Sequence, residues 1–222
     1  MRYYCAMSKS QQRKRVRVGI LGGTFDPVHI GHLLLAQSAL ETWKLDKVIF
    51  MPNNVSPLKL EKRQSSFRHR LAMLKLALRG QSQFEVSDIE FRRGGVSYTF
   101  DTVTALKKTH PDWDIYFIIG MDSLRELHLW YRAKELIKIC RVVTLARPYS
   151  ELGIRNEELG IKSRVAGFSQ KDSKQLIKDI ATSRQIDISS SEIRSRIAKQ
   201  QEIRYLVPER VEKYIHKQRL YL

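Results

Sequence analysis

The sequence predicts an α/β fold: a doubly wound, mostly parallel β-sheet with helices on both faces. Three observations predict this class. Short aliphatic runs alternate with helix-forming runs along most of the chain, which is the pattern of β-α-β units. The most apolar run, residues 114–119, lacks polar alternation and indicates a strand buried on both faces. A chain of 222 residues is also long enough to bury such a sheet within one domain.

Strands are expected where short aliphatic or β-branched runs end at turn-forming residues. Pro52 and Asn53 close the second run, and Pro148 follows the fifth. The expected strands are residues 16–21, 47–51, 84–87, 114–119, 141–146, 164–168 and 185–188.

Helices are expected where apolar residues recur at helical spacing or where a capping signal precedes helix formers. Residues 66–79 place apolar side chains on one side and arginines on the other. A Ser/Thr and Asp cluster can cap residues 99–109, residues 189–192 form a capping box, and Pro208 suits a first turn. The expected helices are residues 33–43, 66–79, 99–109, 133–139, 193–199 and 208–217, with one more between the last two strands. The last two helices form a small C-terminal helical portion.

Two segments are expected to be irregular. Residues 90–95 indicate an exposed excursion, and residues 149–162 indicate a polar loop. The length of the second segment suggests that it orders over a ligand.

The chain is strongly basic, with 40 Lys and Arg against 23 Asp and Glu and a formal net charge of +17. Such a field attracts polyanions from nucleotides to nucleic acids without choosing among them. The basic residues are dispersed and the aromatic residues do not interleave with them, so no specific nucleic-acid partner is expected. No apolar run approaches the roughly 20 residues that cross a bilayer, so no membrane partner is expected.

Residues 1–15 are expected to form a basic flexible tail, and residues 16–222 a single domain. The tail lacks the apolar centre of a secretory signal, and Met7 is an alternative start. Cys5 and Cys140 make no disulfide framework, so free thiols in the cytoplasm are expected. No exposed apolar stripe decides between a monomer and a homo-oligomer.

The chemistry centres on residues 22–32, with the sequence GGTFDPVHIGH, between the first expected strand and the first expected helix. A glycine turn in this place sets backbone N–H groups and a helix N-terminus beside the carboxyl end of a strand. The paired glycines allow a ligand to approach the backbone closely. His29 and His32 flank the helix start, so the stretch predicts a cradle for an anion.

Other interpretations of this stretch are weaker. Its spacing is not the G-x-G-x-x-G of dinucleotide-binding folds, and it lacks the Lys-Ser/Thr ending of a P-loop. His29 and His32 could supply half of a metal site, but no nearby cysteine or carboxylate cluster completes one, so no protein-held metal is expected. The plain alternative is an ordinary strand-to-helix turn with two surface histidines.

Further candidate residues follow other strands, at the carboxyl edge where doubly wound, Rossmann-like sheets bind ligands. They are Asn53 with its loop, residues 120–123 and residues 189–194. Together they offer donors for phosphate, the carboxylate of Asp122 and a second helix N-terminus that carries Arg194.

Residues 22–32 resemble the H-x-G-H signature of the nucleotidyltransferase superfamily. From Val16 to the C-terminus, the chain resembles bacterial nicotinate-nucleotide adenylyltransferases in particular. The ordered motifs that carry this resemblance are residues 22–32, Met51-Pro52-Asn53, Ser97-Tyr98-Thr99-x-Asp101-Thr102, Ile119-Gly120-x-Asp122-Ser123, Trp130 and Ile188-Ser189-Ser190-Ser191-x-Ile193-Arg194. The Ser-Tyr-Thr-x-Asp-Thr segment and Trp130 separate this family from phosphopantetheine adenylyltransferase, which shares the opening motif.

The resemblance implies transfer of the adenylyl group of ATP to nicotinate mononucleotide, giving the dinucleotide and pyrophosphate, with Mg²⁺ carried by ATP and pyrophosphate. The attacking phosphate monoester is already ionised near neutral pH because its second pKa is about 6. No general base is therefore required, and the protein's task is positioning and charge neutralisation.

The resemblance also implies a role for each matching residue. The catalytic residues would be His29, His32 and Arg194. ATP would be bound by Gly22, Gly23, Thr24, Phe25, His29, His32, Gly120, Asp122, Ser190, Ser191 and Arg194. The mononucleotide would be bound by Asn53, Lys59, Thr99, Trp130 and Tyr131, with Trp130 stacked on the pyridine ring. On chemistry alone, Trp130 could equally anchor the core and Asp122 could cap a helix.

The sequence departs from the family pattern at three places. Leu58 stands where many relatives have histidine, Gly95-Val96 precedes Ser97 where a Gly-Pro pair is usual, and Ser191 stands where threonine is typical. The first departure leaves a preference for nicotinamide mononucleotide as an alternative. A phosphopantetheine-type adenylyltransferase and an inactive nucleic-acid-binding relative are more distant alternatives.

Overall fold

The computed structural model describes residues 15–54, 64–146, 165–183 and 186–222. In this part of the chain, six parallel strands form one sheet in the order β3-β2-β1-β4-β5-β6. The strands are β1 Val16–Gly23, β2 Lys47–Pro52, β3 Phe84–Val86, β4 Trp113–Gly120, β5 Arg141–Ala146 and β6 Ile180–Thr182. The predicted α/β class and the doubly wound parallel sheet are confirmed.

The two central strands of the sheet are β1 and β4. In β1 and β4, Ile20 lies beside Phe117 and Leu21 beside Ile118 in parallel register. All four side chains are buried, as expected for strands covered by helices on both faces. The prediction that residues 114–119 form a central strand is confirmed, because β4 pairs with β1 on one side and β5 on the other.

Helices cover both faces of the sheet, and each face has its own apolar cluster. One cluster contains buried residues of α1, α2, α8 and α9, and the other contains buried residues of α4, α5, α6 and α7. The helices are α1 Ile30–Thr42, α2 Phe67–Ala77, α3 Ile89–Arg93, α4 Thr99–Thr109, α5 Met121–Glu126, α6 Ala133–Ile139, α7 Gln170–Lys178, α8 Ser190–Ala198 and α9 Glu209–Lys217. A short 3₁₀ helix, η1, spans Leu127–Leu129.

Caps fix several of the predicted helix starts. Ser66 accepts a hydrogen bond from the backbone of His69 at the start of α2, and Ser189 accepts one from Glu192 at the start of α8. The predicted cap of residues 99–109 is wrong. Tyr98 occupies the N-cap of α4, and no side chain in the described part of the chain caps that helix.

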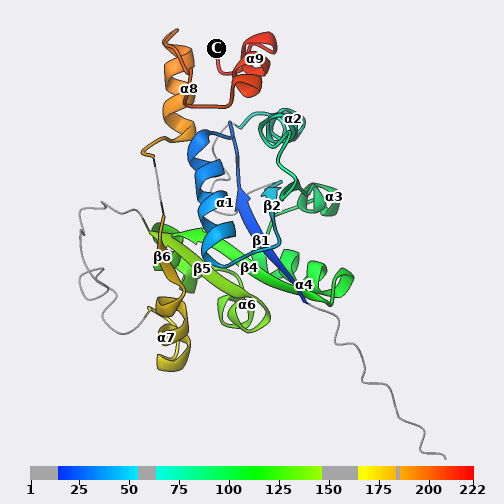
Figure 1. Ribbon diagram of the computed structural model, residues 1–222, viewed down its shortest axis with the longest axis vertical. Helices are drawn as coiled ribbons and strands as arrows, with labels where there is room; N and C mark the ends of the chain where they lie inside the picture. Colours follow the sequence, from blue (N-terminus) through cyan, green and yellow to red (C-terminus); the bar gives the residue numbers. More distant parts are fainter. Residues whose placement is uncertain (1–14, 55–63, 147–164, 184–185) are drawn as a thin grey trace, which may run out of the picture.

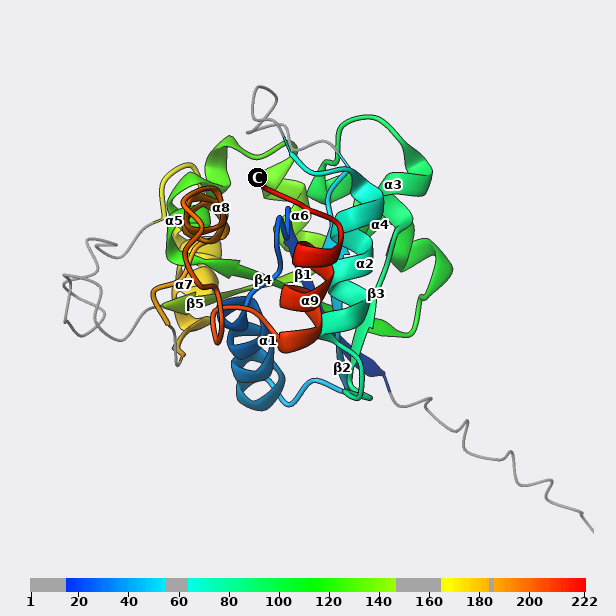
Figure 2. The ribbon, with the colours of Figure 1, turned by 90° about the horizontal axis from the view of Figure 1, so that it is seen from above.

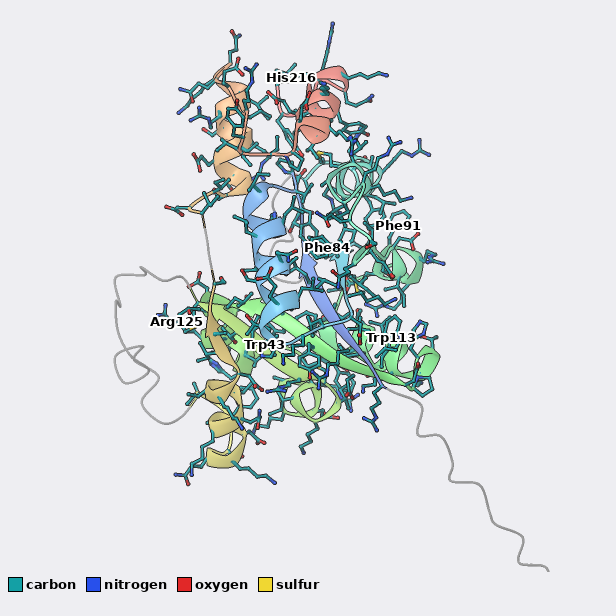
Figure 3. The ribbon with its side chains drawn as sticks, viewed as in Figure 1. Trp43, Phe84, Phe91, Trp113, Arg125 and His216 are labelled. Atoms are coloured by element: carbon teal, nitrogen blue, oxygen red, sulfur yellow. The ribbon has the colours of Figure 1, made fainter. Side chains whose placement is uncertain are left out.

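Two segments differ from the sequence-based expectation. Residues 90–95 are exposed at Phe91, Arg92, Arg93 and Gly95, as predicted, but residues 89–93 form α3 and Glu90 is buried. Phe91 (Figure 3) stacks on Phe67 with ring centroids 4.0 Å apart, and this contact joins α3 to the N-terminal end of α2.

Neither of the two strands expected after residue 160 forms within the described residues. Residues 165–168 form a turn, and residues 186–188 form no strand. The edge strand β6 is Ile180–Thr182, which pairs with Thr144–Ala146 of β5. The helix expected between these segments is confirmed as α7.

The C-terminal helices lie at one end of the sheet. Figure 1 shows α8, α9 and the C-terminus together beyond the upper end of β1, and Figure 2 shows α8 and α9 over the same end from above. No helix in the described ranges combines the length and apolar character that spanning a bilayer requires. Cys140 is buried as a free thiol, and burial raises its pKa to about 12.

Two leucines of η1 give a matched test of the core beneath α5 and α6. Leu127 is 0% exposed, whereas Leu129 is 72% exposed. Leu127→Ala should lower the free energy of unfolding by about 2–5 kcal/mol, because it leaves a cavity in the core. Leu129→Ala should change it by less than about 0.5 kcal/mol. Urea denaturation measures both values, and equal losses would show that this core is wrongly described.

Candidate active site

A cavity of about 520 Å³ opens at the carboxyl ends of the central strands. This is the place where the strand order reverses between β1 and β4, and ligands of doubly wound sheets bind at such a point. Its size falls within the range of ligand sites, roughly 300–1,000 Å³. The lining includes nine of the residues singled out in the sequence: Gly22, Gly23, Thr24, His32, Asn53, Thr99, Gly120, Trp130 and Tyr131.

His29 is buried at the end of the glycine turn and does not line the cavity. It is the N-cap residue of α1, and its side chain is buried. Its ring packs against Gly31 so closely that a Cβ there would lie 3.0 Å from His29 Nδ1. Burial lowers the pKa of His29 from 6.5 to about 4, so its imidazole is neutral at physiological pH.

His32 is the histidine that reaches the cavity. Its ring lies over that of His29 with centroids 3.7 Å apart, and Phe25 meets it edge-on at 4.9 Å. The backbone N–H of His29 donates to His32 Nδ1 at 3.2 Å. Because Nδ1 accepts a hydrogen bond, neutral His32 carries its proton on Nε2. This hydrogen bond therefore orients the ring and leaves Nε2 as its donor nitrogen.

Phe25 packs against the ring of His32. Its side chain is 1% exposed, so the ring contacts the core and His32. Its backbone has φ 51°, in the left-handed region that non-glycine residues seldom occupy. Such conformations are sustained by the surrounding structure and cluster at functional sites. Phe25 therefore shapes the turn through packing and backbone geometry.

The start of α8 is tied to the outer side of the same turn. Ser190 Oγ donates to the carbonyl of Pro27 at 2.9 Å, and Arg194 Nη1 donates to the carbonyl of Asp26 at 2.6 Å. Arg194 Nη2 also donates to Ser191 Oγ at 3.2 Å. These three residues adjoin the turn but do not line the cavity.

The opposite wall of the cavity is formed by the start of α4 and by the residues after η1. Tyr98 and Thr99 lie where the first amide groups of α4 lack a side-chain cap within the described residues. A helix N-terminus of this kind favours an anionic ligand. The rings of Tyr98 and Tyr131 lie 4.7 Å apart across this wall.

Trp130 contributes to both the cavity and the core. It lines the cavity, and its ring meets Phe117 edge-on with centroids 6.0 Å apart. Its indole Nε1 is buried without a hydrogen-bond partner among the described residues. A buried indole N–H usually finds a partner.

Asn53 is held at the end of β2 by both backbone and side chain. Its N–H donates to the carbonyl of Gly23 at 3.0 Å, and its Oδ1 accepts from Arg70 Nη1 at 3.4 Å. Asp122 is not part of the described cavity lining: its side chain is 96% exposed and pairs with Arg125 at 3.8 Å. Lys59 and the loop at residues 149–162 lie outside the described residues.

Glu90 is a cavity residue that the sequence analysis missed. Its carboxyl is buried and accepts a hydrogen bond from Thr102 Oγ1 at 2.8 Å, beside Ser97 and Thr99 in the cavity wall. Burial raises the pKa of Glu90, while hydrogen bonds from Thr102 and Ser97 oppose that shift. The charged sequence around it indicated exposure, and only its place seven residues before Ser97 could have suggested otherwise.

The described lining of the cavity is short of cations. It contains Glu90 and Glu126 but neither lysine nor arginine. In the same ranges, no group of three or more His, Cys, Asp or Glu side chains could hold a metal ion. The local donors for an anion are therefore backbone N–H groups, the His32 ring, the Asn53 amide and hydroxyl groups.

Comparison with known proteins accounts for this arrangement. Residues 20–196 match the model of the cytidylyltransferase-like family. A Synechococcus protein named "probable nicotinate-nucleotide adenylyltransferase" is 41% identical over 97% of this chain and 99% of its own length. A protein of the same name from Desulfatibacillum aliphaticivorans is 39% identical, over 93% and 100%. The chain belongs to the nicotinate-nucleotide adenylyltransferase family.

Solved structures share the fold of this nicotinate-nucleotide adenylyltransferase family member. Plasmodium falciparum nicotinic acid mononucleotide adenylyltransferase complexed with NaAD superposes with a TM-score of 0.67 and 20% identity, covering 93% of this chain and 98% of that one. The same enzyme complexed with APC gives a TM-score of 0.67 at 18% identity. At these identities the likeness establishes the fold.

The buried His29 should make folding sensitive to acid. The unfolded chain takes up a proton near pH 6.5, whereas the folded chain resists protonation until about pH 4. Stability from neutral His29 is therefore present above pH 6.5 and is lost as pH falls toward 4, by about 3 kcal/mol in total. His29→Gln should remove this loss, so its free energy of unfolding relative to the native chain rises between pH 7.5 and 4.5.

The control for this prediction is His216→Gln, at the exposed end of α9 (Figure 3). It removes an imidazole without touching the turn. Denaturant unfolding at several pH values compares the three proteins. A His29→Gln difference that stays constant with pH would contradict the burial of a neutral imidazole.

Proposed function

We propose that this chain transfers the adenylyl group of ATP to nicotinate mononucleotide, forming nicotinate adenine dinucleotide and pyrophosphate for NAD biosynthesis. One observation carries the proposal. A single cavity joins a glycine turn suited to phosphates with a wall that offers an uncapped helix N-terminus and Trp130. The first wall suits ATP, and the second suits a flat ring that bears a carboxylate.

The reaction proposed is an in-line displacement at the α-phosphorus of ATP. An oxygen of the mononucleotide phosphate forms a bond to this phosphorus, and the bond to the oxygen that bridges to the β-phosphorus breaks. Pyrophosphate leaves with the electron pair. Because the attacking phosphate is already ionised, with a second pKa of about 6, the protein need not remove a proton. Its contribution is orientation and stabilisation of charge.

On the ATP side, we assign the central role to His32. The hydrogen bond from the backbone of His29 orients the ring of His32. Its Nε2–H would donate to the charge that builds on the α-phosphate and the leaving group. Neutral His29 acts from below by holding His32 in place. Gly22, Gly23 and Thr24 would offer backbone contacts to the phosphates.

The remaining ATP residues have more distant roles in this proposal. Arg194, held on the carbonyl of Asp26, would bind the pyrophosphate portion together with Ser190 and Ser191. Gly120 and Asp122 would contact the nucleoside at the start of α5. Phe25 would act through the ring of His32 rather than by direct contact.

On the mononucleotide side, Trp130 would stack on the pyridine ring. Thr99 and the backbone near Tyr131 would bind its carboxylate at the uncapped start of α4. Asn53 and Lys59 would steer its ribose phosphate. ATP would enter as its Mg²⁺ complex, so the metal belongs to the substrate. We also propose a cytoplasmic location, which the free thiol of Cys140 supports.

The direct test is pyrophosphate release from Mg²⁺–ATP in the presence of nicotinate mononucleotide. We expect turnover with this acceptor and a lower kcat/KM with nicotinamide mononucleotide. A higher kcat/KM with the amide would reverse the acceptor assignment. Turnover only with phosphopantetheine, or RNA binding without any transfer, would overturn the proposal.

His32→Ala should lower kcat by about a hundredfold or more, because it removes one preorganised donor to the transition state. The turn should keep its shape, since His29 and Phe25 retain their core contacts. Steady-state kinetics with both substrates checks this prediction. An effect confined to KM would show that His32 binds ATP without stabilising the transition state.

Trp130→Ala should raise the KM for nicotinate mononucleotide by about tenfold, from the loss of one stacking contact, and leave the KM for ATP nearly unchanged. It should also lower the melting temperature, because Trp130 packs on Phe117. Trp130→Phe keeps an aromatic face and should show smaller changes in both. If both variants melt early with normal KM values, Trp130 is a core residue only.

A further inference from the structure

The last residues of the chain return to the glycine turn. After α9, the N–H of Leu220 donates to the carbonyl of Ile215 at 3.1 Å, and Tyr221 adopts φ 67°. Leu220 and Tyr221 both pack on the apolar cluster shared by α1, α2, α8 and α9. Figure 1 shows the C-terminus at the same end of the molecule as α8 and α9. The final segment is thus fastened although it ends the chain.

Tyr221 reaches a carboxylate inside the turn. Its hydroxyl donates to Asp26 Oδ1 at 2.6 Å, across 195 positions of sequence. Asp26 is 2% exposed, and its other oxygen, Oδ2, accepts from the N–H of Ser65 at 3.1 Å. Burial, the Asp26 charge and this hydrogen bond raise the pKa of Tyr221, so the hydroxyl stays a donor over the physiological range.

Asp26 also connects to the residue proposed for pyrophosphate binding. Its backbone carbonyl accepts from Arg194 Nη1 at 2.6 Å, and the next carbonyl, of Pro27, accepts from Ser190 at 2.9 Å. On the inner side of the turn, Gly22, Gly23 and Thr24 line the cavity. A shift of Asp26 would therefore move both the backbone that faces ATP and the anchor of Arg194.

We infer that Tyr221 is a positioning residue for the ATP side of the site: its hydroxyl fixes Asp26, and Asp26 fixes the turn and Arg194. The sequence motif contains Asp26 but gives no sign that the chain terminus holds it. Removal of the hydroxyl leaves Asp26 Oδ1 buried without its donor, and a buried carboxylate in that state rearranges or draws in water. This inference rests on the proposed ATP site, whereas the identity of the acceptor bears only on the kinetic readout.

The first experiment compares Tyr221→Phe with Tyr214→Phe. Tyr214 is a matched control because its hydroxyl also joins the C-terminal region to α2, at 2.9 Å from His69 Nδ1, but does not contact the turn. Tyr221→Phe should raise the KM for ATP about tenfold, the size expected for one hydrogen bond to a charged group. The KM for the mononucleotide should stay within about twofold, since that wall of the cavity is unchanged. Tyr214→Phe should change neither.

A second measurement separates this inference from the proposed reaction. Calorimetry measures the affinity for an ATP analogue with a methylene bridge between the α- and β-phosphates, which requires no acceptor and no turnover. Tyr221→Phe should weaken this affinity about tenfold relative to the native chain. Should the native chain fail to use nicotinate mononucleotide, the proposed reaction falls while this comparison still decides the role of Tyr221.

Coupling to Asp26 provides the decisive check. Asp26→Asn keeps the shape of the side chain but removes its charge, and it should weaken analogue binding in the same direction. The loss of analogue affinity in the double variant should be smaller than the product of the losses in the two single variants, because both substitutions remove the same contact. All variants are compared well below their melting temperatures. Unchanged analogue affinity in Tyr221→Phe, or equal losses in Tyr214→Phe, would overturn the inference in favour of a purely structural contact.

Discussion

The parallel pairing of β1 with β4 is the constraint on which the rest of the molecule depends. A parallel connection requires a crossover, so the chain leaves β1 through α1 on one face and leaves β4 through α5 on the other. Since the two helices depart to opposite faces, the strand ends between them stay uncovered. The cavity lies there, and its walls are built from segments that follow β1, β2, β3 and β4.

A second set of interactions makes the turn after β1 rigid. Arg70 is 2% exposed, and its guanidinium donates to the carbonyls of Thr24 and Ser65 and to Asn53. Burial lowers the pKa of Arg70, and the carboxylate of Asp26 opposes this shift. A buried charge is costly unless its hydrogen bonds are satisfied, so these groups admit few alternative arrangements of the turn. The polar layer behind the turn thus fixes what the backbone amides present to the cavity.

Much of the fold could be predicted from the sequence, because apolar continuity and caps are local signals. The strands from β1 to β5 and the Ser189 cap before α8 follow directly from such patterns. The edge strand β6 forms where no local pattern predicts it, because its pairing with β5 is decided by tertiary contacts. In the site, the glycine turn is a local motif. The burial of Glu90 and the contact of Tyr221 with Asp26 depend on segments far apart in sequence, so no local pattern reveals them.

The shortage of cationic side chains in the described lining of the cavity has a kinetic consequence. The described lysines and arginines, apart from the buried Arg70, are at least partly exposed outside this lining, where they would draw anionic nucleotides toward the protein over distances comparable to the Debye length, about 8 Å at physiological ionic strength. Inside the cavity, fixed backbone dipoles would hold the phosphates of the proposed substrate, and mobile ions screen such buried groups far less. Added salt should therefore lower the association rate of nucleotides more than it raises their dissociation rate. The exposed charges set the first rate, and the backbone of the cavity sets the second.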